Sequence, residues 1–113
     1  MKIENYSFGR VTINGKDYTS DVIIYPDRVD SSWWRKEGHR LQIDDLKDII
    51  GANPEVLIVG TGAYGVMAVS NETAEFLKKK GIRLITEKTR NACDTYNKIS
   101  GSGRVIAALH LTC

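Results

Sequence analysis

The segment with the clearest chemical potential is Gly60-Thr61-Gly62-Ala63-Tyr64-Gly65, which follows the G-x-G-x-x-G pattern of dinucleotide-binding loops. In those loops the glycines permit a tight turn, and the N–H groups at the start of the next helix bind the pyrophosphate. Here an apolar stretch, Val66-Met67-Ala68-Val69, separates the glycines from the first credible helix cap. We therefore expect a non-helical loop, and three interpretations stay open: a conformational bend, a small-anion or metabolite pocket, and a dinucleotide site.

The two cysteines and two histidines are the nucleophilic and metal-ligating side chains to consider. Cys93 is expected about one turn into a helix, where the helix dipole favours a thiolate, and His110 could serve as its base. The same cysteine falls on the inward helix face, where buried thiols are inert. His110-x-x-Cys113 pairs two metal ligands, but only His39 and Cys93 remain to complete a tetrahedral zinc site. We expect no metal, no cofactor and no catalytic residue, and keep Cys93 and His110 as candidate reactive residues.

A second notable segment, residues 33–39, places two tryptophans beside a cluster of charged side chains. Trp and Arg are frequent anchors of protein interfaces, and both can stack on bases. The structural alternative is that one tryptophan closes the core while the other covers a strand edge beneath an arginine. Tyr64, within the glycine string, is either an exposed lid or a plug. We expect a ligand- or partner-binding surface formed by Trp34, Arg35, His39, Gly60, Thr61, Gly62 and Tyr64.

Length, composition and charge exclude several classes of protein. The chain has 113 residues, enough for one hydrophobic core, and its net charge of +2 gives no reason to expect a nucleic-acid or membrane partner. The sequence has no signal-peptide pattern and no apolar stretch of membrane-spanning length. Two cysteines without a pairing pattern indicate a reducing compartment, so we expect a cytoplasmic protein.

The segments that must position these residues change character near residue 42. Before it the sequence consists of short runs typical of β-strands. Asn14-Gly15 predicts a type I′ hairpin turn because both residues tolerate a positive φ. Pro26-Asp27 is typical of a turn that stops a buried strand. We expect strands over residues 3–8, 10–13, 22–25 and 29–35.

After residue 42, helices and strands alternate. We expect helices over residues 43–50, 71–80 and 89–99 and strands over 56–59, 82–86 and 104–111. Ser70 or Asn71 is expected to cap the second helix, Gly81 to end it, and Thr89 to cap the third. Crossover helices favour parallel strand pairing. The sequence thus predicts an α/β fold in one domain over residues 1–113, with a β-rich part (1–41) and a β-α-β-α-β part (42–113).

Four strings occur together and in order: Trp34-Arg35-x-x-Gly38-His39, Val56 to Gly62, Asn91-Ala92-Cys93-x-x-Tyr96-Asn97, and Ala108 to Cys113. This combination resembles the small Mth-type domain family, which includes an adipogenesis-associated protein and a mitochondrial complex I (NADH dehydrogenase) assembly factor. The resemblance implies a layered α/β fold with a central mixed, mostly parallel sheet flanked by helices, one strand being antiparallel. It also implies a smaller N-terminal β element packed on one side, and no established catalytic residue or cofactor.

From the missing catalytic constellation and this resemblance we expect a small binding or assembly-type protein whose partner is another protein. A small anion or metabolite at the glycine string is the alternative ligand. The alternative function is a small-metabolite or nucleotide-binding enzyme that uses a pocket at the strand ends.

Overall fold

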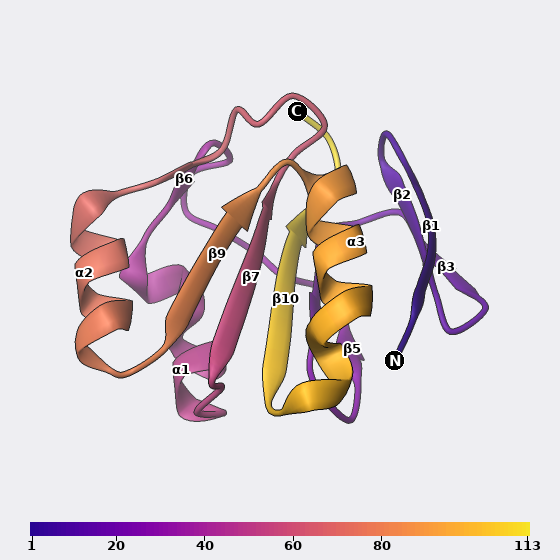
Figure 1. The fold of residues 1–113 in the computed structure, drawn as a ribbon. Coiled ribbons are helices and arrows are strands. Elements are labelled where there is room, and N and C mark those ends of the chain that lie inside the picture. The colour runs from indigo at the N-terminus through magenta and orange to yellow at the C-terminus, as the bar shows by residue number, and fades with distance from the viewer.

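The computed structural model describes residues 1–113 and is built around a five-stranded mixed sheet with the strand order β5-β4-β10-β7-β9 (Figure 1). Its members are β4 (Val22–Ile24), β5 (Val29–Asp30), β7 (Val56–Thr61), β9 (Arg83–Glu87) and β10 (Val105–His110). The last three pair in parallel, whereas β4 is antiparallel to both β10 and β5. The predicted α/β fold with a mixed, mostly parallel sheet is confirmed.

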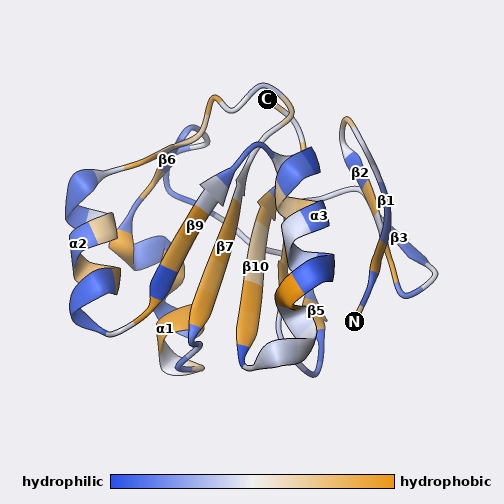
Figure 2. Ribbon diagram, viewed as in Figure 1, coloured by the Kyte–Doolittle hydropathy of each residue, from blue (hydrophilic) through white to orange (hydrophobic).

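Helices cover both faces of this sheet because the strand side chains alternate between two apolar layers. Ile58 and Ala107 face α3 (Thr89–Ile99), whose Ala92, Cys93 and Tyr96 are buried. Neighbouring residues of the same strands face the other side, which is covered by a 3-10 helix (Ile43–Leu46), α1 (Lys47–Gly51) and α2 (Asn71–Lys79). Figure 2 shows apolar strands between helices whose outer surfaces are polar.

The first residues form a separate three-stranded sheet of β1 (Ile3–Ser7), β2 (Arg10–Ile13) and β3 (Lys16–Tyr18). The predicted hairpin turn lies between β2 and β3, with Asn14 at φ 49° and Gly15 at φ 80°. This sheet packs on α3, and Asn97 of that helix bonds both backbone groups of Ile3: Ile3 N donates to Asn97 Oδ1 (2.9 Å) and Asn97 Nδ2 to Ile3 O (2.7 Å).

Several local predictions were wrong in extent. The strand expected over 29–35 is only β5, because Asp30 Oδ1 accepts bonds from the N–H and hydroxyl of Ser32 and the chain turns away from the sheet there. The helix expected over 43–50 is split into a 3-10 turn and α1. Thr89 is the first residue of α3 and donates its hydroxyl to His110 O (2.6 Å), so it does not cap the helix.

Two short strands were not expected at all. β6 (Arg40–Leu41) and β8 (Ala68–Val69) pair in parallel beside the main sheet. Their pairing joins the segment that follows Trp33 and Trp34 to the segment that follows the glycine string. The predictions for the two ends of α2 are confirmed. Ser70 Oγ caps the helix by accepting from Thr73 N, and Gly81 follows its last turn with φ 77°. No helix of the structure has the length and apolarity that a bilayer crossing requires.

The contact between the small sheet and α3 generates a stability prediction. Replacing Asn97 with alanine should lower the free energy of unfolding by about 1–2 kcal/mol, because the N–H and C=O groups of Ile3 both lose their partner. Urea unfolding followed by tryptophan fluorescence measures this change. Asn91→Ala is the matched control, because Asn91 is exposed on the same helix and makes no side-chain hydrogen bond. Equal losses in both variants would contradict the assignment.

Candidate functional site

The backbone after β7 forms the non-helical loop that the sequence predicts. β7 itself runs through Gly60 and Thr61, residues 62–67 contain no helix, and α2 begins only at Asn71. In Figure 1 this loop, the turn between β1 and β2, and the last residues of the chain lie at one end of the molecule, at the carboxyl ends of β7, β9 and β10. Ligands of open α/β sheets bind at this end.

The N–H groups of this loop are occupied by the protein itself. Gly62 N donates to Thr89 Oγ1 (2.8 Å), Ala63 N to Thr112 O (2.6 Å) and Val66 N to Cys113 O (3.1 Å). Within the loop and the preceding strand, Gly65 N donates to Gly62 O (3.3 Å) and Met67 N to Thr61 O (3.1 Å). Only Tyr64 has an N–H group in residues 62–67 without a protein acceptor. A pyrophosphate needs several free N–H groups that converge on one point. The geometry therefore favours the conformational interpretation of the glycine string over the dinucleotide site.

Two of the glycines are needed because other segments come too close for a side chain. A Cβ on Gly60 would lie 2.9 Å from both Leu109 Cδ2 and Thr89 Oγ1. Gly62 has a φ of +105°, and a Cβ there would overlap the carbonyl group of Cys113. The last residues of the chain thus lie against the glycine loop, where a bound phosphate would otherwise sit.

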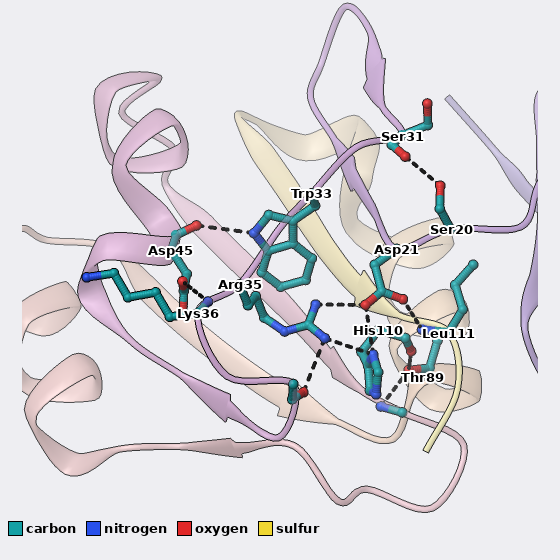
Figure 3. Close-up of polar contacts among 12 residues, drawn as sticks. Ser20, Asp21, Ser31, Trp33, Arg35, Lys36, Asp45, Thr89, His110 and Leu111 are labelled. Carbon is teal, nitrogen blue, oxygen red and sulfur yellow. Dashed lines mark hydrogen bonds and ion pairs between the residues drawn. The ribbon is translucent and has the colours of Figure 1, made fainter.

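A buried polar cluster lies beneath this end of the sheet (Figure 3). Asp21, just before β4, accepts hydrogen bonds at Oδ2 from Arg35 Nη1 and His110 Nδ1, both at 2.8 Å, and at Oδ1 from Leu111 N, also at 2.8 Å. The guanidinium of Arg35 stacks 4.7 Å from the Trp33 ring centroid and donates from Nη2 to Gly38 O at 3.2 Å. The side chains of Arg35 and His110 are only 5% and 8% exposed.

The hydrogen bonds assign the proton of His110. Nδ1 lies 2.8 Å from Asp21 Oδ2 and 3.1 Å from Arg35 Nη2. A guanidinium can only donate and a carboxylate can only accept, so Nδ1 carries a proton that it donates to Asp21. The approach of Arg35 Nη2 to Nδ1 is then a close contact without a hydrogen bond. In this arrangement His110 Nε2 is buried and has no protein partner, as is also true of Arg35 Nε.

The charge of Asp21 is stabilised by these contacts. Burial raises the pKa of its carboxyl group, but hydrogen bonds from His110, the Leu111 N–H and Arg35 outweigh that effect and lower the pKa from 3.8 to about 2. The carboxylate is therefore ionised at neutral pH and compensates the buried guanidinium.

Comparison with known proteins identifies the family. The sequence profile of a family described as protein of unknown function (DUF498/DUF598) matches residues 3–110. The chain belongs to this family. The Mth-type resemblance drawn from the sequence motifs is confirmed by this match and by a solved structure described as MT938, which is 27% identical, covers 99% of this chain and 98% of that one, and superposes with a TM-score of 0.81.

Curated relatives of this DUF498/DUF598 chain carry the name NADH dehydrogenase (ubiquinone) 1 alpha subcomplex assembly factor 3. The Danio rerio protein is 32% identical over 109 residues, which are 94% of this chain and 61% of that protein. The Homo sapiens protein is 26% identical over 111 residues, 96% of this chain and 59% of that protein. The chain therefore spans about three-fifths of the length of these relatives.

Solved structures share the whole architecture. A conserved hypothetical protein from Pyrococcus horikoshii superposes with a TM-score of 0.86 at 30% identity, covering 100% of both chains. A Bordetella pertussis protein described as a Mth938-like domain gives a TM-score of 0.76 at 22% identity, covering 97% of this chain and 85% of that one. The second likeness shows a shared fold alone.

The structure brings some of the expected site residues together and separates others. Thr61 pairs with His110 across β7 and β10, and the ring of exposed His39 lies 6.3 Å from the His110 ring. Arg35 contacts His110 from inside the protein. Trp34 is 74% exposed and lines a separate cleft beside Trp33, where four aspartates and two lysines also gather.

Cys93 has the properties of a packed thiol. It is buried, and burial together with the charge of Asp94 raises its pKa to about 12, so the thiol stays protonated at neutral pH. No hydrogen bond joins it to His110, whose Nδ1 is committed to Asp21. A protonated, buried thiol is a poor nucleophile.

Sequence reasoning missed Asp21 and two exposed apolar residues, Phe8 and Val66. Asp21 gave no signal, since its partners His110 and Leu111 lie 89 and 90 residues away. Phe8 did give one: a large apolar residue directly before Gly9, at the break between the expected strands 3–8 and 10–13, has few neighbours to bury it.

The lowered pKa of Asp21 generates a prediction on pH dependence. Because its folded pKa lies below its unfolded value of 3.8, the stabilisation is complete well above pH 3.8 and is lost as the pH falls toward about 2. Asp21→Asn should therefore lower the free energy of unfolding by at least about 2 kcal/mol at pH 7 and by much less at pH 2. Urea unfolding at both pH values measures the difference. Asp27→Asn, at a carboxylate 76% exposed, is the control and should have little effect at either pH. A pH-independent loss in Asp21→Asn would contradict the assignment.

The contact of Gly62 with the end of the chain generates a second prediction. Gly62→Ala should destabilise the fold by about 2–3 kcal/mol, through the positive φ and the overlap with Cys113. It should also speed amide hydrogen exchange at Ala63 and Val66. Gly51→Ala, at an open position of α1, should be neutral or slightly stabilising. Protection factors that stay unchanged at the loop would show that the chain end does not hold it.

Proposed function

We propose that this chain is a protein-binding module of the assembly type, and that its partner docks on an exposed apolar surface at the glycine-string end of the sheet. We call this the loop-tip surface and define it as Phe8, Tyr64 and Val66. The assembly-factor relatives suggest a protein partner, and the exposure of these three side chains is the observation that carries the proposal.

The loop-tip surface gathers most of the large apolar side chains that the fold leaves in solvent. Phe8 is 57% exposed, Tyr64 70% and Val66 46%, and the only other exposed large apolar residue is Trp34. The rings of Phe8 and Tyr64 lie 6.1 Å apart although they come from the β1–β2 turn and the loop after β7. Exposed aromatic residues that cluster from distant segments are typical of interaction sites.

The backbone under this surface is fixed by hydrogen bonds before any partner binds. Gly9 N donates to Leu111 O at 2.8 Å, which holds the turn that carries Phe8. The bonds of Ala63 and Val66 to the last two residues hold the loop that carries Tyr64. A partner therefore does not have to order this surface, and the entropic cost of association is lower.

The predicted site residues take different roles in this proposal. Tyr64 contacts the partner, Gly60 and Gly62 let the chain end approach the loop, and Arg35 supports the surface from below. Thr61 lies in the strand that leads into the loop, and its hydroxyl donates to Glu87 O at 3.1 Å. Trp34 and His39 lie outside the loop-tip surface as defined. Because both cysteines are free thiols, we keep the cytoplasm as the proposed compartment.

One observation favours the alternative, a metabolite-dependent enzyme. The Asp21–His110 pair orients an imidazole with a free Nε2, as in general-base dyads. That nitrogen is buried, however, and a substrate would have to open the structure to reach it. A thermal-shift screen against nucleotides, flavins and acyl thioesters tests this alternative, since a tight ligand raises the melting temperature.

The binding proposal is tested by affinity capture with the double variant Phe8→Ser/Tyr64→Ser. We expect it to lose the partners that the unchanged protein retains, as identified by mass spectrometry. Its free energy of unfolding should change by less than about 1 kcal/mol, because both side chains are largely exposed. Trp34→Ser, at the remaining exposed aromatic residue, is the matched control and should retain the partners. Retention by the double variant, or loss by the control alone, would refute the loop-tip surface.

A further inference from the structure

We propose that the open edge of β9 is an interaction surface for a second copy of the chain. The two β9 strands pair antiparallel about Ile85 and join the two five-stranded sheets into one continuous sheet. This surface is distinct from the loop-tip surface, and the inference does not depend on the proposed function.

The main sheet has two edges, and only the edge at β9 is open along a regular strand. At the other edge β5 is two residues long, and the bonds from Ser32 to Asp30 Oδ1 turn the chain away from the sheet. β9 has five residues, contains no proline and keeps an unbroken register with β7 (Figure 1). Prolines, bulges and very short strands are the usual means by which proteins stop a sheet edge from pairing. The edge of β9 has none of these three.

Every second residue of β9 turns its backbone groups away from β7. Arg83 N donates to Glu55 O at 3.0 Å, so the odd-numbered residues of β9 bond to β7 in the parallel ladder. The N–H and C=O groups of Leu84 and Thr86 therefore point off the edge, where no other backbone group of the protein bonds to them. The side chain of Thr86 is exposed, so α2 does not cover this position. Two N–H and two C=O groups are thus free to bond a further strand.

The order of side chains along β9 makes the strand complementary to itself. In an antiparallel pair centred on Ile85, Leu84 of each copy lies opposite Thr86 of the other, and the two residues exchange the N–H···O=C bonds that are free on both strands. Arg83 then lies opposite Glu87 at both ends of the pair. Pairing centred on either charged residue would oppose like charges. Pairing centred on Leu84 or Thr86 would leave both charges unopposed.

Both apolar layers of the fold reach this edge and end in half-buried aliphatic side chains. Ile85 packs against the cluster beneath α3, and Leu84 packs against the cluster on the opposite face. Antiparallel strands of one sheet are related by a two-fold axis perpendicular to the sheet, so the α3 faces of both copies lie on the same side. Ile85 therefore meets its own counterpart at the close spacing of a non-hydrogen-bonded pair, and each apolar layer continues across the axis.

A second copy fits this edge better than a strand of an unrelated protein. An unrelated strand would have to carry the same charges in reverse order, which a second copy supplies by symmetry. The contact is also closed, because each copy uses its open edge and presents the short β5 at the far side of the joint sheet. The carboxyl ends of the strands point in opposite directions in the two copies, so both loop-tip surfaces stay accessible.

The test is analytical ultracentrifugation of the unchanged protein and of the charge-reversed variants Arg83→Glu and Glu87→Arg. We expect the unchanged protein to pass from monomer to dimer between about 10 and 500 µM, as a small interface allows. Each variant alone opposes like charges at both ends of the pair and should raise the dissociation constant by at least about tenfold. An equimolar mixture of the two variants restores both opposite pairs and should dimerise like the unchanged protein.

Lys98→Glu is the matched control, because it reverses an exposed cation in the last turn of α3 and should leave dimerisation unchanged. A monomer at 500 µM would overturn the inference. An equal weakening by Lys98→Glu, or a mixture that does not recover, would show that net charge and not the register governs association, which also overturns it. A dimer that Phe8→Ser/Tyr64→Ser abolishes would assign the contact to the loop-tip surface instead.

Disulfide cross-linking measures the register independently of charge. In a Cys113→Ser background, where the remaining Cys93 is buried, Ile85→Cys should form a covalent dimer on mild oxidation, because the two Cα atoms of such a pair lie about 4.5 Å apart. Thr86→Cys is the control and should stay monomeric on non-reducing gels, since its two copies are about 8 Å apart, beyond disulfide reach. Cross-linking of Thr86→Cys alone, or of neither variant, would refute pairing about Ile85.

Discussion

The contacts of the Asp21 carboxylate hold together the end of the molecule on which the proposed function depends. Its two oxygens accept bonds from three groups, Arg35, His110 and Leu111 N, which belong to two distant segments. Without this carboxylate a guanidinium that is 5% exposed would be left without a counter-charge. Such a loss costs far more than a surface ion pair contributes. The cluster therefore fixes where the last strand ends.

The residues that follow β10 connect the end of this strand to the glycine loop by hydrogen bonds. Leu111 N is held by Asp21 and Leu111 O accepts from Gly9 N, while Thr112 O and Cys113 O accept from the loop after β7. A glycine string of dinucleotide-binding type thus becomes a cradle for the chain's own backbone. In nucleotide enzymes such glycines let a phosphate group come close to the backbone. Here they let the last residues of the chain come close instead.

The elements of the fold that the sequence predicted correctly are those encoded by neighbouring residues, such as apolar runs, helix caps and turn pairs. The alternation of apolar runs and capped helices between residues 56 and 111 sufficed for the parallel core, and Asn14-Gly15 for the hairpin. The strand predicted over residues 29–35 was wrong beyond Asp30 because tertiary contacts decide the conformation of this segment. Trp33 donates its indole N–H to Asp45 O at 3.1 Å, and Arg35 turns inward to Asp21. An aspartate before a strand looks solvated until its partners are known. Four of the seven residues expected at the binding surface are buried: Arg35 by its side chain, and Gly60, Thr61 and Gly62.

Support and surface are nevertheless physically coupled. The cluster joins Arg35 and His110 to Asp21, which directly precedes β4, and His110 is the last residue of β10. The start of α3 is held beside the same strand end, because the Thr89 hydroxyl donates to His110 O at 2.6 Å. His110 thus takes part in both arrangements, through its side chain to Asp21 and its carbonyl to Thr89. A change in the buried cluster would therefore also shift the start of α3 and the glycine loop, whose Gly62 N donates to Thr89 Oγ1, although no cluster side chain belongs to the loop-tip surface.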